Sequence, residues 1–162
     1  SSDLDTHHDL PTVTTDQATL RQTDFAPFRA LADLPMAMTA HIVFSAYDSR
    51  PATQSPAMIA AIRNEIGFQG LLMTDDLNMQ ALTGDLGSRT ALSMAAGCDI
   101  ALHCKGDLDE MQAVASAAGT MTAATRARAE AALARRHAPE AVDIAALQAE
   151  FSALIAAGDA HG

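Results

Sequence analysis

The chain has 162 residues, a formal net charge of −10 and 49% hydrophobic residues, but only 4% aromatic residues. This length and apolar content suit one globular domain with a substantial core. The acidic excess and the scarcity of aromatic rings argue against a nucleic-acid-binding surface, and no uninterrupted apolar segment approaches the ~18 residues of a membrane helix.

The first third of the chain predicts a helix, a strand and a second helix. Thr15 or Asp16 can cap the first helix, whose apolar residues recur at helical spacing: Leu20, Phe25, Phe28 and Leu31. A buried strand of about eight residues is expected over 36–44. Beyond a polar loop, Ser55 is placed to cap a helix with Pro56 at its first position, and Gly67 is placed to end it.

The stretch that organises the chain is 70–76, in which an apolar run ends in Thr74, Asp75 and Asp76. Such a run fits a strand buried on both faces, as in a parallel sheet. Loops beyond the carboxyl ends of parallel strands carry the chemistry, so the acid pair is a candidate site. The alternative is that one of the two acids caps the next helix.

The rest of the chain predicts a helix over 88–96, a third strand over 98–104 and alanine-rich helices that end with an amphipathic one over 143–157. The only basic cluster is expected to be a solvated helix face: Arg126, Arg128, Arg135 and Arg136. Strands that alternate with helices predict βα units and a parallel sheet. Three strands cannot cover themselves, which indicates part of a larger structure.

The two cysteines predict free thiols. Cys98 and Cys104 lie six residues apart on the third predicted strand, roughly 20 Å from end to end. A disulfide needs Cα atoms within ~7 Å. Free thiols fit a reducing compartment, so a cytoplasmic location is expected.

Four segments carry a resemblance to a known family, and they stand in this order: Asp5-Thr6-His7 with Leu10-Pro11; Met38-Thr39-Ala40-His41-Ile42 with Pro51-Ala52-Thr53; Arg63 through Asp75; and Ala95-Ala96-Gly97-Cys98-Asp99. Together they resemble glycoside hydrolase family 3, most closely its single-domain β-N-acetylhexosaminidase branch, which recycles bacterial peptidoglycan. The resemblance covers about residues 1–135. The Asp-Ser-His loop of that branch reads Asp-Thr-His here.

The resemblance implies an α/β fold, the C-terminal portion of a (β/α)8 barrel with about strands six to eight. The N-terminal strands, and the groups that hold the sugar in the family, would lie outside this chain. Residues 1–15 would form the acid/base loop, 16–135 the βα units and 136–162 a C-terminal helical tail. By itself, such a piece is expected to be inactive and prone to associate through its open sheet edges.

The resemblance also implies a retaining glycosidase with Asp75 as nucleophile, acting through a covalent glycosyl-enzyme. An ordinary Asp, with a pKa of ~3.9, is ionised near neutrality as a nucleophile must be. His7 would be the acid/base, because an imidazole with a pKa of ~6.5 can donate and accept a proton near pH 7. Asp5 would orient His7 and favour its protonated form.

Further contacts with the sugar are expected from His41, Asn78 and Met79, although His41 can equally be a packed strand residue. Asp76 is expected to cap or order the loop. No cofactor is expected, and no zinc-binding pattern is present, because the histidines lack ligand spacing with Cys or Glu. The expected partner is a small carbohydrate, an N-acetylglucosamine-containing muropeptide, with no nucleic acid and no membrane. The protein at full length is expected to be a monomer.

Two alternatives remain open at this point. A receiver-type phosphorelay domain also uses strand-end carboxylates, a Thr after an apolar strand, here Thr39, and a late Lys, here Lys105. Its usual order places the acids before the Thr, whereas Thr39 precedes the acid pair here. The other alternative is an incomplete barrel that has no activity of its own.

Overall fold

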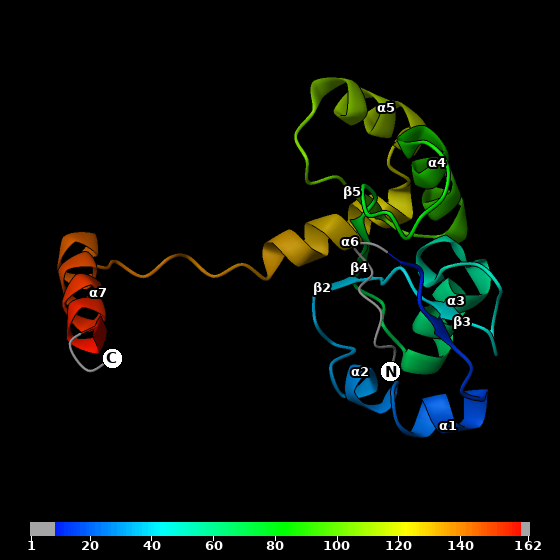
Figure 1. Ribbon diagram of the computed structural model, residues 1–162, viewed down its shortest axis with the longest axis horizontal. Helices are drawn as coiled ribbons and strands as arrows, with labels where there is room; N and C mark the ends of the chain where they lie inside the picture. The colour runs from blue at the N-terminus through cyan, green and yellow to red at the C-terminus, as the bar shows by residue number, and fades with distance from the viewer. Residues whose placement is uncertain (1–8, 160–162) are drawn as a thin grey trace.

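The strands form two small parallel sheets (Figure 1). The computed structural model describes residues 9–159. The three-stranded sheet has the order β2 (Met36–Met38), β4 (Leu71–Asp76) and β5 (Ile100–Leu102), and both of its pairings are parallel. In the other sheet, β1 (Thr12–Val13) pairs in parallel with β3 (Val43–Phe44). The predicted parallel arrangement of three strands is confirmed, in a mixed α/β fold.

Helices separate most of the consecutive strands and also follow the last one. They are α1 (Gln17–Gln22), α2 (Ala26–Ala30), the 3-10 helix η1 (Ala52–Gln54), α3 (Pro56–Ala61), the π-helical turn η2 (Ile62–Ile66), α4 (Leu86–Ala96), α5 (Leu108–Ala118), α6 (Ala123–Ala134) and α7 (Ile144–Asp159). Figure 1 shows α7 apart from the other elements, at the end of an extended segment. All of its side chains from 144 to 157 are exposed. In the described part of the chain, no helix has the length and apolar character needed to cross a membrane.

The predicted strand over 36–44 is wrong in one respect, because it is two strands in two sheets. Strand β2 ends at Met38, and the chain leaves the sheet before β3 begins at Val43. Between them, the side chains of Thr39 and His41 turn inward and are buried. Strand β2 is also not buried on both faces, since Met36 and Met38 are 44% and 51% exposed.

Several helix ends agree with the sequence and one helix does not. Asp16 caps α1 by accepting a hydrogen bond from Thr19 N at 3.0 Å, and Ser55 caps α3 by accepting one from Met58 N at 3.1 Å. Gly67 ends η2 with a φ of 86°, which favours glycine. The single helix predicted from Asp16 is instead α1 followed by α2. Pro27 explains the break, because a proline inside a continuous helix removes a backbone donor and clashes with the preceding turn.

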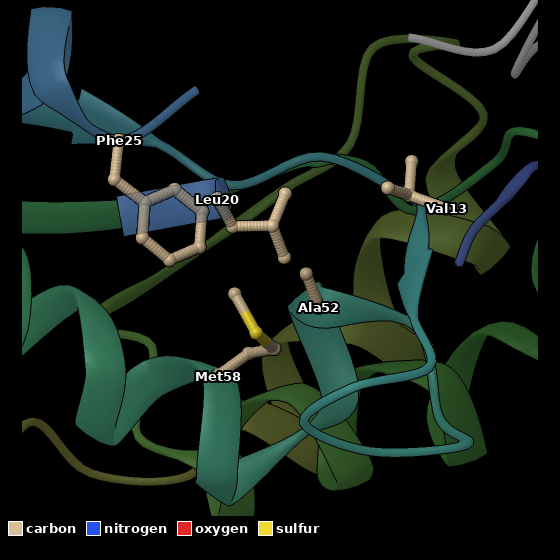
Figure 2. Packing of buried hydrophobic residues seen from close by; sticks show 5 residues of the cluster. All are labelled: Val13, Leu20, Phe25, Ala52 and Met58. Atoms are coloured by element: carbon tan, nitrogen blue, oxygen red, sulfur yellow. The ribbon is translucent and has the colours of Figure 1, made fainter. Parts of the chain in front are cut away.

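Two clusters of buried side chains hold the elements together. The first joins β1, α1, η1, α3 and Phe25 at the start of α2, and Figure 2 shows its members around a common space: Val13, Leu20, Phe25, Ala52 and Met58. The second packs α3 and α4 against β4: Ile59, Phe68, Leu72, Ala96 and Cys98. The second cluster reaches β4 through Leu72, and β4 is the middle strand of its sheet.

A buried carboxylate, Asp99, fixes β4 to two other elements. Its Oδ2 accepts hydrogen bonds from Arg63 Nη2 at 2.8 Å and from Leu72 N at 3.0 Å. Its Oδ1 accepts from the Thr125 hydroxyl at 2.9 Å and from Arg128 Nη1 at 2.8 Å. The predicted solvated arginine face is therefore wrong for Arg128. This side chain on α6 forms an ion pair with Asp99, which is only 4% exposed.

We predict that Asp99→Asn destabilises the full-length protein by about 3 kcal/mol at pH 7, because it leaves two partly buried guanidinium groups without their buried counter-charge. Burial acts to raise the pKa of Asp99, but its hydrogen bonds and ion pairs outweigh burial and hold it below the ordinary value of 3.8. The ionised group therefore stabilises the fold above pH ~4, and this contribution is lost as pH falls through the folded-state pKa. Urea unfolding at several pH values measures both effects.

The matched control is Asp109→Asn on exposed α5 surface, which should cost no more than about 1 kcal/mol. An Asp99→Asn protein as stable as this control at pH 7 would show that the ionised Asp99 side chain does not stabilise the fold.

Candidate active site

The carboxyl end of β4 carries Thr74, Asp75 and Asp76 in succession. Thr74 is completely buried, and its Oγ1 accepts a hydrogen bond from Leu102 N at 2.9 Å. This bond lies where the pairing of β4 with β5 is irregular, between Met73 and Asp76. The Thr74 hydroxyl oxygen thus takes the place of a backbone carbonyl as the acceptor for Leu102 N, and this bond keeps β5 beside the end of β4.

Asp76 joins the two loops that follow β4 and β5. Its Oδ1 accepts hydrogen bonds from Asn78 N at 3.1 Å and from Cys104 N at 3.2 Å. The loop-ordering role predicted for Asp76 is confirmed by these contacts. Such a side chain satisfies backbone donors that the end of a strand leaves unpaired.

Asp75 is half-buried at the same strand end, and its Oδ1 accepts a hydrogen bond from Asp76 N at 2.8 Å. This local bond restricts the rotation of the carboxylate. Cys104 lies close by, with its N–H 3.2 Å from Asp76 Oδ1. Desolvation and then the charges of Asp76 and Asp75 raise the pKa of its thiol. Two acids and two loop ends therefore gather at the carboxyl edge of the sheet, as expected for a site in a parallel α/β fold.

His41 lies behind this edge and has no exposed surface. Its Nε2 is 2.9 Å from the carbonyl oxygen of Asp76, and its Nδ1 is 2.8 Å from Thr53 Oγ1. Burial lowers the pKa of His41 despite the hydrogen bond to Asp76. The ring is neutral, and Nε2 carries the proton because a carbonyl oxygen can only accept. In this position, the sugar contact that we predicted for His41 would require the ring to move.

Asn78 and Met79 lie in the loop after β4. Asn78 is half-buried, and its Nδ2 donates to Glu110 Oε2 at 3.2 Å. Met79 is buried, and its carbonyl oxygen accepts a hydrogen bond from Arg89 Nη1 at 3.1 Å. The same guanidinium donates to Leu77 O at 2.8 Å. Arg89 thus shapes this loop from α4, while the sugar contacts of Asn78 and Met79 stay predictions.

Glu110 connects this loop to the one after β5. Besides Asn78, its carboxylate accepts from Lys105 Nζ at 2.8 Å, and His103 Nε2 is 3.5 Å away. The hydrogen bonds from Lys105 and Asn78 lower the pKa of Glu110. Sequence reasoning missed both Glu110 and Arg89. A capping pattern, Asp107 followed three residues later by Glu110, marks the start of α5 but gives no sign of these loop contacts.

His7 and Asp5 lie outside the described residues, so their roles stay predictions. Within residues 9–159, no group of three or more His, Cys, Asp or Glu side chains could hold a metal ion. Cys98 and Cys104 are both free thiols. Lys105, which the receiver-domain alternative requires beside the acid pair, is instead paired with Glu110.

We predict that Asp76→Ala frees the two loops, whereas Asp76→Asn keeps them in place because the amide oxygen can still accept both backbone hydrogen bonds. Amide hydrogen exchange at Asn78 and Cys104 measures this directly. The Ala variant should lose protection at both amides, and the Asn variant should retain it. Equal protection in the two variants would contradict the role of this side chain.

Comparison with known proteins identifies the family. Residues 1–136 match the model of the glycosyl hydrolase family 3 N-terminal domain. A β-hexosaminidase of Bordetella avium is 36% identical over 107 residues, which are 63% of this chain and 31% of that protein. A family 3 β-N-acetylglucosaminidase from a Paenibacillus species superposes with a TM-score of 0.71 at 25% identity, over 89% of this chain and 31% of the other. NagZ from Neisseria gonorrhoeae superposes with a TM-score of 0.67 at 29% identity, over 91% and 42% of the two chains.

The chain spans about a third of the length of the curated relatives that it matches. The family match covers every described element from β1 through α6. It confirms the resemblance predicted from the sequence and leaves the receiver-domain alternative without support. On these grounds, the chain belongs to glycosyl hydrolase family 3.

Proposed function

We propose that the protein is a retaining β-N-acetylhexosaminidase that removes terminal β-linked N-acetylglucosamine from peptidoglycan-derived muropeptides. The observation that carries the proposal is the position of Asp75, which directly follows the buried Thr74 at the carboxyl end of the central strand in a family 3 chain. The β-hexosaminidase and β-N-acetylglucosaminidase names of its relatives support the reaction and the sugar.

The proposed reaction has two steps. In the first, the Asp75 carboxylate attacks the anomeric carbon while His7 gives a proton to the departing glycosidic oxygen, which forms a glycosyl ester on Asp75. In the second, His7 takes a proton from water, the water oxygen attacks the same carbon, and the Asp75 carboxylate leaves. Asp5 would orient the imidazole and stabilise its charged form. Each step passes through a transition state with positive charge on the sugar ring.

The exposed apolar surface supports a barrel that is larger than the described sheet. Strands β2 and β5 each pair on one side only within the described chain. Beside β2, exposed apolar side chains gather: Phe28, Leu31, Leu34, Met36 and Met38. We propose that this sheet is the C-terminal portion of a (β/α)8 barrel, with 1–15 as the acid/base loop, 16–135 as the βα units and 136–162 as a helical tail. The free thiols Cys98 and Cys104 support a cytoplasmic location.

We predict that Asp75→Ala in the full-length protein abolishes hydrolysis of 4-nitrophenyl N-acetyl-β-D-glucosaminide. Azide should restore release of 4-nitrophenol, because a small anion fits the space that the carboxylate leaves and attacks from the same face. The product should be the α-configured glycosyl azide, which NMR identifies. An Asp109→Ala protein is the control and should hydrolyse normally. Ordinary turnover by Asp75→Ala would rule out Asp75 as the nucleophile.

We predict that His7→Ala slows poor leaving groups most, by about 10²–10⁴-fold, because general acid catalysis matters less when the aglycone departs easily. A series of aryl N-acetyl-β-D-glucosaminides with different phenol pKa values measures this dependence. The His8→Ala protein is the neighbouring control and should keep the dependence of the unaltered protein. A uniform loss across the series in His7→Ala would contradict the acid role.

A further inference from the structure

The register of the sheet brings the segment that follows β2 beside the end of β4. Met38 lies opposite Met73, and Thr39 N donates to Met73 O at 2.9 Å, which extends the pairing by one bond. His41 and Asp76 each lie three residues beyond this matched pair. Their contact, Nε2 to the Asp76 carbonyl oxygen at 2.9 Å, therefore links the two strand ends just past the last backbone bond.

On its other side, the His41 ring is hydrogen-bonded to a chain of two buried hydroxyl groups. A neutral ring with its proton on Nε2 presents a bare Nδ1 at 2.8 Å from the Thr53 hydroxyl, whose one proton pairs with this nitrogen in preference to the Ala40 carbonyl oxygen at 3.1 Å. Thr53 Oγ1 can then accept from the Thr39 hydroxyl, 2.9 Å away. Thr39, Thr53 and His41 are 5%, 0% and 0% exposed. Enclosed hydrogen bonds of this kind hold one orientation, because no water competes for them.

Asp76 is thereby held at three points. Its carbonyl oxygen accepts from His41, its Oδ1 accepts from the amides of Asn78 and Cys104, and its own N–H donates to Asp75 Oδ1 at 2.8 Å. The last of these bonds is the one that orients the Asp75 carboxylate. A rotation of the Asp76 backbone that moved its N–H would therefore also turn the Asp75 carboxylate.

We propose that His41 is a positioning residue for the nucleophile: it holds the Asp76 backbone, with Thr53 fixing its tautomer, so that Asp75 keeps the orientation required for attack. This inference rests on the proposed role of Asp75. It assigns His41 no contact with the sugar and no proton transfer.

The electrostatic surroundings of His41 are consistent with a positioning role. Asp75 and Asp76 favour a protonated ring, Arg89 opposes it, and burial is the largest effect and keeps the ring neutral. A neutral donor orients the strand end without placing a positive charge beside Asp75. An imidazolium there would form an ion pair with the carboxylate and weaken it as a nucleophile.

The test measures covalent trapping in the full-length protein with 5-fluoro-N-acetyl-β-D-glucosaminyl fluoride. Fluorine beside the ring oxygen disfavours the positive charge of both transition states, and the fluoride leaving group lets the first step run, so a glycosyl-Asp75 ester should accumulate. Mass spectrometry gives the labelled fraction and the labelled residue. The time course gives the limiting rate constant and the concentration for half-saturation.

We predict that His41→Leu lowers the limiting rate constant by about 10- to 100-fold with little change in half-saturation, because misplacement of a reacting group by ~1 Å costs about that much. His41→Gln should recover most of the rate, since its amide N–H can reach the Asp76 carbonyl. Thr53→Val, which removes the hydroxyl, should also slow labelling, and Thr53→Ser should not.

The outcomes separate the inference from the function on which it rests. If the unaltered protein forms no ester on Asp75, the proposed mechanism fails and the inference with it. If Asp75 is labelled and all four variants react at the rate of the unaltered protein, only the inference is overturned. Partial misfolding of a variant lowers the labelled fraction, whereas the rate constant of the remaining fraction still reports on position.

Discussion

The carboxylate of Asp99 joins the strand that carries the candidate nucleophile to the helices behind it. It lies near the start of β4, where it accepts hydrogen bonds from the backbone of Leu72 and from the guanidinium groups of Arg63 and Arg128. At the other end of β4, side chains again bridge to β5, through Thr74 to Leu102 N and through Asp76 to Cys104 N. A buried ion pair costs desolvation free energy, so its benefit lies in geometric specificity as well as stability. Both ends of the central strand are thus set by side chains, and the position of Asp75 depends on them.

The parts of the fold that could be predicted from the sequence depend on local chemistry. Ser55 before Pro56 and the positive φ of Gly67 are determined by the residues next to them. The step from an apolar run to Asp75 and Asp76 likewise marked the end of a buried strand. The parts that could not be predicted are contacts between distant residues, such as Arg128 with Asp99, 29 positions apart, or His41 with Asp76, 35 apart. Neither spacing nor periodicity contains that information.

The exposed apolar side chains are informative because they lie along an unpaired strand edge. Monomeric proteins rarely leave a large contiguous apolar patch in water, and an open edge strand invites pairing with another strand. Here Met36 and Met38 on β2 line the same hollow as Phe28 on α2. The relatives extend well beyond the matched region, since it makes up 31% of one and 42% of another. A barrel closed by further strands would cover both the patch and the edge, which is why this surface supports the proposed architecture.

The burial of His41 constrains which residue can be the general acid of the proposed reaction. A residue that alternately gives and takes a proton needs access to the leaving oxygen and to water. His41 has no exposed surface, its pKa is lowered by burial, and its Nε2–H donates a hydrogen bond to a backbone carbonyl oxygen. It can orient the end of β4, but it cannot exchange protons with a substrate. In the proposed mechanism the two histidines have different roles. An enclosed, neutral His41 suits positioning, whereas the acid/base role proposed for His7 requires an accessible imidazole with a pKa near neutrality.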